Sequence, residues 1–108
     1  MNSNILFLGI DSLRADHCYN QDKLYPTPNL DQLIKKGIIF DESISCADGT
    51  ALALGSIFTG LYPFQSGIST YKLESTKPNF FTHLGKLGYN VYATVPNSIT
   101  LNKITLNF

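Results

Sequence analysis

The chain has 108 residues, a length that fits one small domain. Eight Lys and Arg residues balance eight Asp and Glu residues, so the basic excess of a nucleic-acid-binding or polybasic membrane-binding protein is missing. A hydrophobic content of 44% excludes a disordered chain, and no apolar run approaches the ~18–20 residues of a membrane-spanning helix. No signal peptide is recognised at the start, so we expect a cytoplasmic protein that binds no nucleic acid and spans no membrane.

The first half of the chain predicts a strand, a helix and a second strand. Residues 4–11 form an apolar run that ends in Asp11, which is typical of a buried strand in a parallel sheet. Pro28 is expected at the first position of a helix with Thr27 as its N-cap, and this helix should end at Gly37. Residues 38–45 predict the second strand. The apolar face of the helix is expected in the core, and it comprises Leu30, Leu33 and Ile34.

The second half predicts two more helices and a third strand. A helix of small and apolar residues begins at Thr50, residues 64–78 are expected to form a loop, and Asn79 can cap a further helix. Residues 89–95 alternate in a strand-like pattern. This order predicts an α/β fold in which helices flank a mostly parallel sheet, all within one domain over residues 1–108.

Two side chains lie where a parallel α/β sheet binds its ligands, beyond the carboxyl ends of the strands. Asp11 ends the first strand, although taken alone it is more often the cap of a turn. Thr50 begins the helix after the second strand, and taken alone it is more often an N-cap. A helix N-terminus also binds anions, and a metal on Asp11 could activate the Thr50 hydroxyl as a nucleophile. This site requires that the two strands are neighbours. Cys18 and Cys46 are interpreted as inert thiols.

Four ordered segments then resemble the sulfatase family of the alkaline phosphatase superfamily. They are similar to the opening strand, the next helix and strand, the signature after the nucleophile, and the following helix and strand. The segments are residues 4–17, residues 27–40, the Thr-Gly-Leu-Tyr-Pro block at 59–63 followed by Gly67, and residues 81–89. The chain therefore resembles the N-terminal portion of a sulfatase-like α/β domain, and we expect this fold to be incomplete within the 108 residues.

The resemblance implies roles for particular residues. The family nucleophile lies nine residues before the Thr of the Thr-Gly-Leu-Tyr-Pro block, which corresponds to Thr50. True sulfatases have a Cys there, which is converted to formylglycine, whereas Thr resembles the phosphodiesterase and phosphotransferase branches. The paired Asp of the family corresponds to Asp11 and Ser12, so the implied metal ligands are Asp11, Thr50 and, more weakly, Ser12. The backbone near Ala51 would bind the anion.

The resemblance also implies the activity. We expect a metal-dependent hydrolase or transferase of sulfate or phosphate esters, with an anionic ester as substrate and a divalent ion, Ca²⁺, Mg²⁺, Mn²⁺ or Zn²⁺, as cofactor. The family domain is several hundred residues long, so the expected partner of these residues is the C-terminal portion of the same fold. Two alternatives remain open: a non-catalytic truncated remnant, and a module that binds an anion without turnover.

Overall fold

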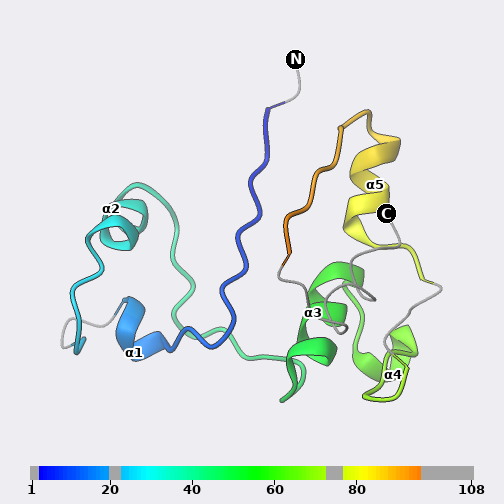
Figure 1. Ribbon diagram of the computed structural model, residues 1–108, viewed down its shortest axis with the longest axis horizontal. Helices are drawn as coiled ribbons and strands as arrows, with labels where there is room; N and C mark the ends of the chain where they lie inside the picture. The colour runs from blue at the N-terminus through cyan, green and yellow to red at the C-terminus, as the bar shows by residue number, and fades with distance from the viewer. Residues whose placement is uncertain (1–2, 20–22, 73–76, 96–108) are drawn as a thin grey trace. The chain divides into compact units, whose positions relative to one another are not determined.

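The computed structural model describes residues 3–19, 23–72 and 77–95, and in this part of the chain it contains five helices (Figure 1). They are α1 (Ala15–Cys18), α2 (Pro28–Lys36), α3 (Thr50–Thr59), α4 (Pro63–Ser66) and α5 (Phe80–Lys86). The chain divides into two compact units: residues 3–43 form one, and the described residues from Ile44 onward belong to the other. Each unit is described by itself.

The predicted sheet is not formed in the described residues. Residues 4–11, 38–45 and 89–95 contain neither helix nor strand. Apolar side chains in all three segments face solvent, as shown by the exposed fractions of Leu6 (89%) and Tyr92 (90%). A buried parallel strand requires neighbouring strands to complete its hydrogen bonds and helices to cover both faces. Because these segments lack that environment, their strand-like composition does not produce a ladder.

Helix α2 begins and ends where the sequence predicts. Pro28 occupies its first turn, Thr27 precedes it, and Gly37 follows it, with the Gly37 N–H donating to the Ile34 carbonyl at 3.4 Å. The predicted burial of its apolar face is wrong for Leu33, which is 64% exposed. The other two residues of that face are only half-buried. The face was predicted to cover a sheet, and the described residues of this unit form none.

The core of the second unit lies where α3 packs against α4 and α5. Phe58 of α3 and Ile68, after α4, are both buried. The ring of Phe58 lies 5.0 Å from the ring of Phe81 and 5.7 Å from that of Phe80, measured between ring centres. Aromatic pairs at this separation contribute about 0.5–1.5 kcal/mol beyond their buried area. This aromatic cluster therefore holds α5 against α3.

Helix α4 lies at the start of the stretch expected to be a loop. Pro63 is its first residue, and the Tyr62 N–H donates to the Gln65 side-chain oxygen at 3.1 Å. Gly60 after α3 and Gly67 after α4 have φ angles of 68° and 73°, the left-handed conformation that glycine adopts at little cost. Gly60 therefore ends α3 and Gly67 ends α4, and α4 is a single helical turn between these two glycines.

Helix α5 confirms the predicted cap. The Thr82 N–H donates to Asn79 Oδ1 at 2.9 Å, and the Asn79 N–H donates to Thr82 Oγ1 at 3.2 Å. This reciprocal pair satisfies backbone donors that a helix start otherwise leaves without partners. The helix therefore begins at Phe80 for a local reason that the sequence already contains.

Candidate functional site

Thr50 is the first residue of α3, and the N-cap is Gly49, which has extended backbone angles (φ −113°, ψ 141°). The alternative of Thr50 as N-cap is therefore wrong by one position. The first hydrogen bond of the helix runs from the Ala53 N–H to the Gly49 carbonyl, at 2.9 Å. The amides of Ala51 and Leu52 precede that bond, in the first turn, where backbone N–H groups point out of the helix end. They carry the partial positive charge of the helix N-terminus.

The Thr50 side chain is exposed, and Ala51 is half-buried. The Thr50 hydroxyl, at the first helical position, lies at the same end of the helix as these amides. Such an arrangement suits a bound anion, because the N–H groups and the helix dipole both favour negative charge. The structure places Thr50 and Ala51 at the start of α3, and the binding of an anion there remains a prediction.

Asp11 and Ser12 form a turn at the end of the first apolar segment, and both are exposed. Ser12 has φ 60°, the one positive φ angle outside glycine in the part of the chain that the structure describes. The turn belongs to the unit of residues 3–43, whereas Thr50 belongs to the other unit. A metal ion shared by Asp11, Ser12 and Thr50 remains a prediction.

The donor atoms of these three residues fit the chemistry of a hard cation, because a carboxylate and two hydroxyls are oxygen ligands. They fill only part of a shell, since Mg²⁺ takes about six ligands and Ca²⁺ six to eight. In residues 3–19, 23–72 and 77–95, no group of three or more His, Cys, Asp and Glu residues is placed to hold a metal. A metal site that used Asp11, Ser12 and Thr50 would therefore need further ligands.

Asp16, in the first turn of α1, is paired with Arg14. The Arg14 guanidinium donates to both of its carboxylate oxygens, from Nε at 2.9 Å and from the terminal nitrogen at 2.6 Å. This hydrogen bonding lowers the pKa of Asp16 below its ordinary value. The neighbouring His17 ring packs edge-on against Tyr25, with ring centres 5.4 Å apart. Cys18 and Cys46 are free thiols.

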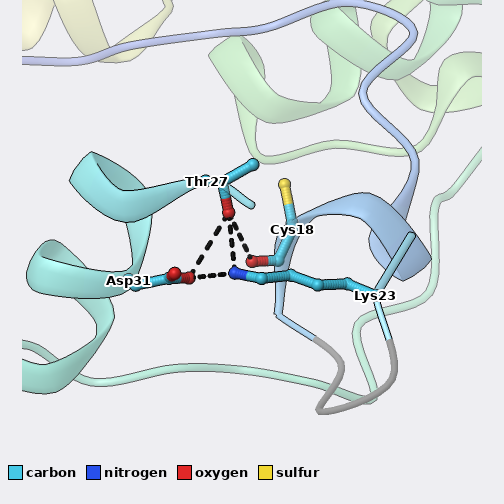
Figure 2. A network of polar contacts seen from close by, with 4 residues as sticks. All are labelled: Cys18, Lys23, Thr27 and Asp31. Carbon is cyan, nitrogen blue, oxygen red and sulfur yellow. Dashed lines mark hydrogen bonds and ion pairs between the residues drawn. The ribbon is translucent and has the colours of Figure 1, made fainter. Parts of the chain in front are cut away.

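A polar network that the sequence analysis did not find joins α1 to α2 (Figure 2). The Lys23 ammonium donates to Thr27 Oγ1 at 2.9 Å and forms an ion pair with Asp31. Thr27 Oγ1 is also within 3.4 Å of the Cys18 carbonyl oxygen, to which it donates. The Lys23 side chain is only 16% exposed. The sequence contains a signal for one part of the network only, the spacing of four residues from Thr27 to Asp31.

This network explains why the Thr27 side chain does not cap α2 in the usual way. Its hydroxyl accepts from Lys23 and donates towards the Cys18 carbonyl oxygen and Asp31 Oδ1, the latter at 3.3 Å, and no side-chain bond to the helix backbone is made. The hydrogen bond from Lys23, with a smaller contribution from the charge of Lys23, lowers the pKa of Asp31. The network fixes the approach to α2, and its groups are occupied with one another rather than directed at a ligand.

None of the helices in the described part of the chain is both long enough and apolar enough to cross a bilayer.

Comparisons with known proteins assign the family. The sulfatase family model matches residues 3–105. The chain is 33% identical over 90 residues to an ulvan-active sulfatase of Formosa agariphila, covering 81% of this chain and 18% of that protein. It is 32% identical over 87 residues to arylsulfatase H of Homo sapiens, covering 79% of this chain and 15% of that protein. No solved structure matches. The chain spans less than a fifth of these relatives, and it belongs to the sulfatase family.

Proposed function

We propose that this chain supplies the nucleophile region of a sulfatase-family hydrolase or transferase that acts on sulfate or phosphate esters, with Thr50 as the nucleophile. The observation that carries the proposal is the position of Thr50. It is the first residue of α3, nine residues before Thr59 of the Thr-Gly-Leu-Tyr-Pro block, in a chain of this family. Residues 1–108 are then the N-terminal portion of the catalytic domain.

The chemistry requires three events at Thr50. The ester anion binds at the start of α3, where the Ala51 amide and its neighbours offer donors and positive charge. The Thr50 hydroxyl gives its proton to water, and Oγ1 forms a bond to phosphorus or sulfur while the bond to the leaving oxygen breaks and that oxygen takes a proton from water to leave as the alcohol. Water then releases the group in a hydrolase, or another hydroxyl accepts it in a transferase.

A Thr hydroxyl is a weak nucleophile until a base or a metal activates it. Asp11 and Ser12 would hold one side of a divalent cation, with the Thr50 oxygen as a further ligand. When bound, Ca²⁺, Mg²⁺, Mn²⁺ or Zn²⁺ supplies Lewis-acid polarisation. The remaining ligands would come from the C-terminal portion of the family fold.

Two observations bear on whether the substrate is a sulfate ester or a phosphate ester. Both relatives are named as sulfatases, which favours a sulfate ester. A Thr in place of the formylglycine Cys resembles the branches of the superfamily that act on phosphate, which favours a phosphate ester. An assay that offers both chemistries to the same preparation separates them.

The experiment measures hydrolysis of an aryl sulfate, an aryl phosphate and a phosphodiester, each with Mg²⁺, Mn²⁺, Ca²⁺ or Zn²⁺. Two preparations are compared: the 108-residue chain, and a longer chain from the same locus that includes the rest of the family domain. We expect turnover in the longer chain alone. Thr50→Ala should abolish it, and Thr50→Ser should retain part of it. The matched control is Thr59→Ser, which keeps the hydroxyl that donates to the Gly55 carbonyl at 2.7 Å.

Other results of this assay would contradict the proposal or favour one of its alternatives. Turnover that survives Thr50→Ala in the longer chain contradicts the role of Thr50 as nucleophile. Thr50-dependent turnover by the 108 residues alone contradicts the need for further ligands. If no ester is turned over but sulfate or phosphate shifts the Ala51 amide resonance, the anion-binding alternative replaces the enzyme. If neither is seen, the chain is a non-catalytic remnant.

A further inference from the structure

The dipeptide directly before α3 combines a reactive sequence with an open position. Asp48 is the one aspartate or asparagine of the sequence that is followed by a glycine. A bond between the Gly49 nitrogen and the carboxyl carbon of Asp48 closes a five-membered ring, which is a ring size with little strain. Glycine has no side chain to block this approach, and its backbone turns freely. Ring closure is therefore easier at Asp48 than at an aspartate followed by a larger residue.

The structure leaves both reacting groups accessible. Asp48 is exposed, and neither Asp48 nor Gly49 belongs to a helix or a strand. In the part of the chain that the structure describes, the Asp48 carboxylate makes no hydrogen bond and no ion pair. The Gly49 carbonyl accepts from the Ala53 N–H, but the Gly49 N–H donates to none of the described residues. The reaction at this dipeptide therefore has no such contact to break.

Two other aspartates lack this combination. The Arg14 guanidinium donates to both carboxylate oxygens of Asp16. Asp31 is paired with Lys23, and the amide that follows it belongs to Gln32, within α2, where amides donate along the helix. Ring closure at either position would break an ion pair, and at Asp31 it would also disturb the helix. These contacts make Asp48 the more reactive position.

We propose that Asp48 is a site of spontaneous modification, where aspartate converts to isoaspartate through a cyclic imide. In the first step the Gly49 nitrogen bonds to Asp48 Cγ, the bond from Cγ to its hydroxyl oxygen breaks, and that hydroxyl leaves with the amide proton as water. In the second step water cleaves the imide. Cleavage between nitrogen and Cγ restores aspartate, whereas cleavage between nitrogen and the main-chain carbonyl carbon gives isoaspartate. The mass of the chain is unchanged.

The product alters the start of α3. The main chain of isoaspartate runs through Cβ and Cγ, so it gains one methylene group directly before Gly49, the N-cap. The Gly49 carbonyl accepts the first hydrogen bond of the helix, at 2.9 Å, and the longer link should displace that carbonyl and Thr50 after it. One consequence rests on the proposed function: if Thr50 is the nucleophile, modified molecules of the longer chain lose activity.

The test is to warm the 108-residue chain in mildly acidic buffer and to digest samples over time. Mass spectrometry with fragmentation between Cα and Cβ then distinguishes isoaspartate from aspartate. We expect isoaspartate at Asp48 to form about tenfold faster, or more, than at Asp41, which is also exposed but precedes Glu42. The amide resonances of Gly49 and Ala53 should shift in proportion to the isoaspartate content.

Two variants separate the chemistry from the fold. Gly49→Ala should slow the conversion by about tenfold, because a methyl group hinders the attacking nitrogen. A Cβ at Gly49 would meet nothing within 4 Å, so the helices should be retained, which circular dichroism checks. Asp48→Glu keeps the charge but must close a larger ring, so it should give no detectable product at this position.

Three results would overturn the proposal. The first is an absence of isoaspartate at Asp48 over the time in which a peptide of residues 45–52 converts. The second is a conversion that Gly49→Ala does not slow, and the third is a reaction at Asp16 or Asp31 as fast as at Asp48. Because neither readout uses turnover, the modification can be established or rejected even if Thr50 proves not to be the nucleophile.

Discussion

The ammonium group of Lys23 forms an ion pair with the carboxylate of Asp31, eight residues further along the chain, in the first turn of α2. The hydrogen bond from Lys23 lowers the pKa of Asp31 in the folded protein. A carboxyl whose folded pKa is lowered stabilises the protein above its unfolded pKa of about 4, and this contribution is lost as the pH falls through the folded value. The pair should therefore stabilise the chain at neutral pH and cease to do so in acid.

The first prediction concerns that pKa. Lys23→Met should raise the pKa of Asp31 towards its ordinary value, because the donor that favours the ionised carboxylate is removed. The measurement is a titration of the Asp31 carboxyl carbon by NMR. Lys35→Met is the matched control, since Lys35 makes only the smallest contribution to the shift. An equal effect of the two substitutions would contradict the ion pair as the cause.

The second prediction concerns the contact between Gly55 of α3 and Ile68. A Cβ atom at Gly55 would lie 2.5 Å from Ile68 Cδ1. Gly55→Ala should therefore destabilise the protein by about 1–2 kcal/mol through overpacking, despite the better helix propensity of Ala. In an Ile68→Val background, which removes Cδ1, the same substitution should be neutral or stabilising. Denaturant unfolding of the four chains measures this coupling.

Gly85 in α5 is the matched control for that experiment, because a Cβ there would meet nothing within 4 Å. Gly85→Ala should stabilise the protein by about 0.5–1 kcal/mol through helix propensity alone. If Gly55→Ala were as stabilising as Gly85→Ala, the close approach of Ile68 to α3 would not hold in solution.

The third prediction compares two buried serines. The Ser56 hydroxyl is buried without a hydrogen-bond partner among the described residues. The Ser66 hydroxyl, equally buried, donates to the Pro63 carbonyl at 3.1 Å and accepts from the Ile68 N–H at 3.3 Å. Ser56→Ala should stabilise the protein by about 1 kcal/mol, and Ser66→Ala should destabilise it by a similar amount. Thermal unfolding of both variants measures the difference, and a loss of stability in Ser56→Ala would reveal a partner for its hydroxyl.

Structure that depends on interactions between residues close in the sequence can be predicted from it, whereas structure that depends on distant residues cannot. The helices beginning at Pro28, Thr50 and Phe80 could be predicted, because caps, proline and glycine act within a few residues. The strands could not, since a ladder needs partners far away in the sequence, and in the described residues these are not assembled. Thr50 was correctly placed at a helix start for the same local reason. The predicted approach of Thr50 to Asp11 requires that the two strands pair in a sheet.

The Lys23–Thr27–Asp31 network shows the same limit inside a short segment. Thr27 and Asp31 are four residues apart, a spacing that brings side chains together on a helix. Lys23 precedes the helix, so its position depends on the path of the chain between α1 and α2. Sequence spacing alone could not determine that path, and the network became visible only in three dimensions.

The last prediction is that the 108-residue chain binds divalent cations with a Kd above about 1 mM. Complete oxygen sites in extracellular Ca²⁺ modules reach roughly 10⁻⁴–10⁻³ M with six or more ligands, several of them carboxylates. Asp11, Ser12 and Thr50 offer one carboxylate and two hydroxyls, so water must complete the shell. The measurement is the broadening of backbone resonances by Mn²⁺. Broadening at Asp11 should require millimolar ion and should disappear in Asp11→Asn, whereas Glu42→Gln, at another exposed acidic position, should leave it unchanged. Joint broadening of Asp11 and Thr50 at one ion concentration would support a shared site, while micromolar binding would show that further ligands lie within these residues.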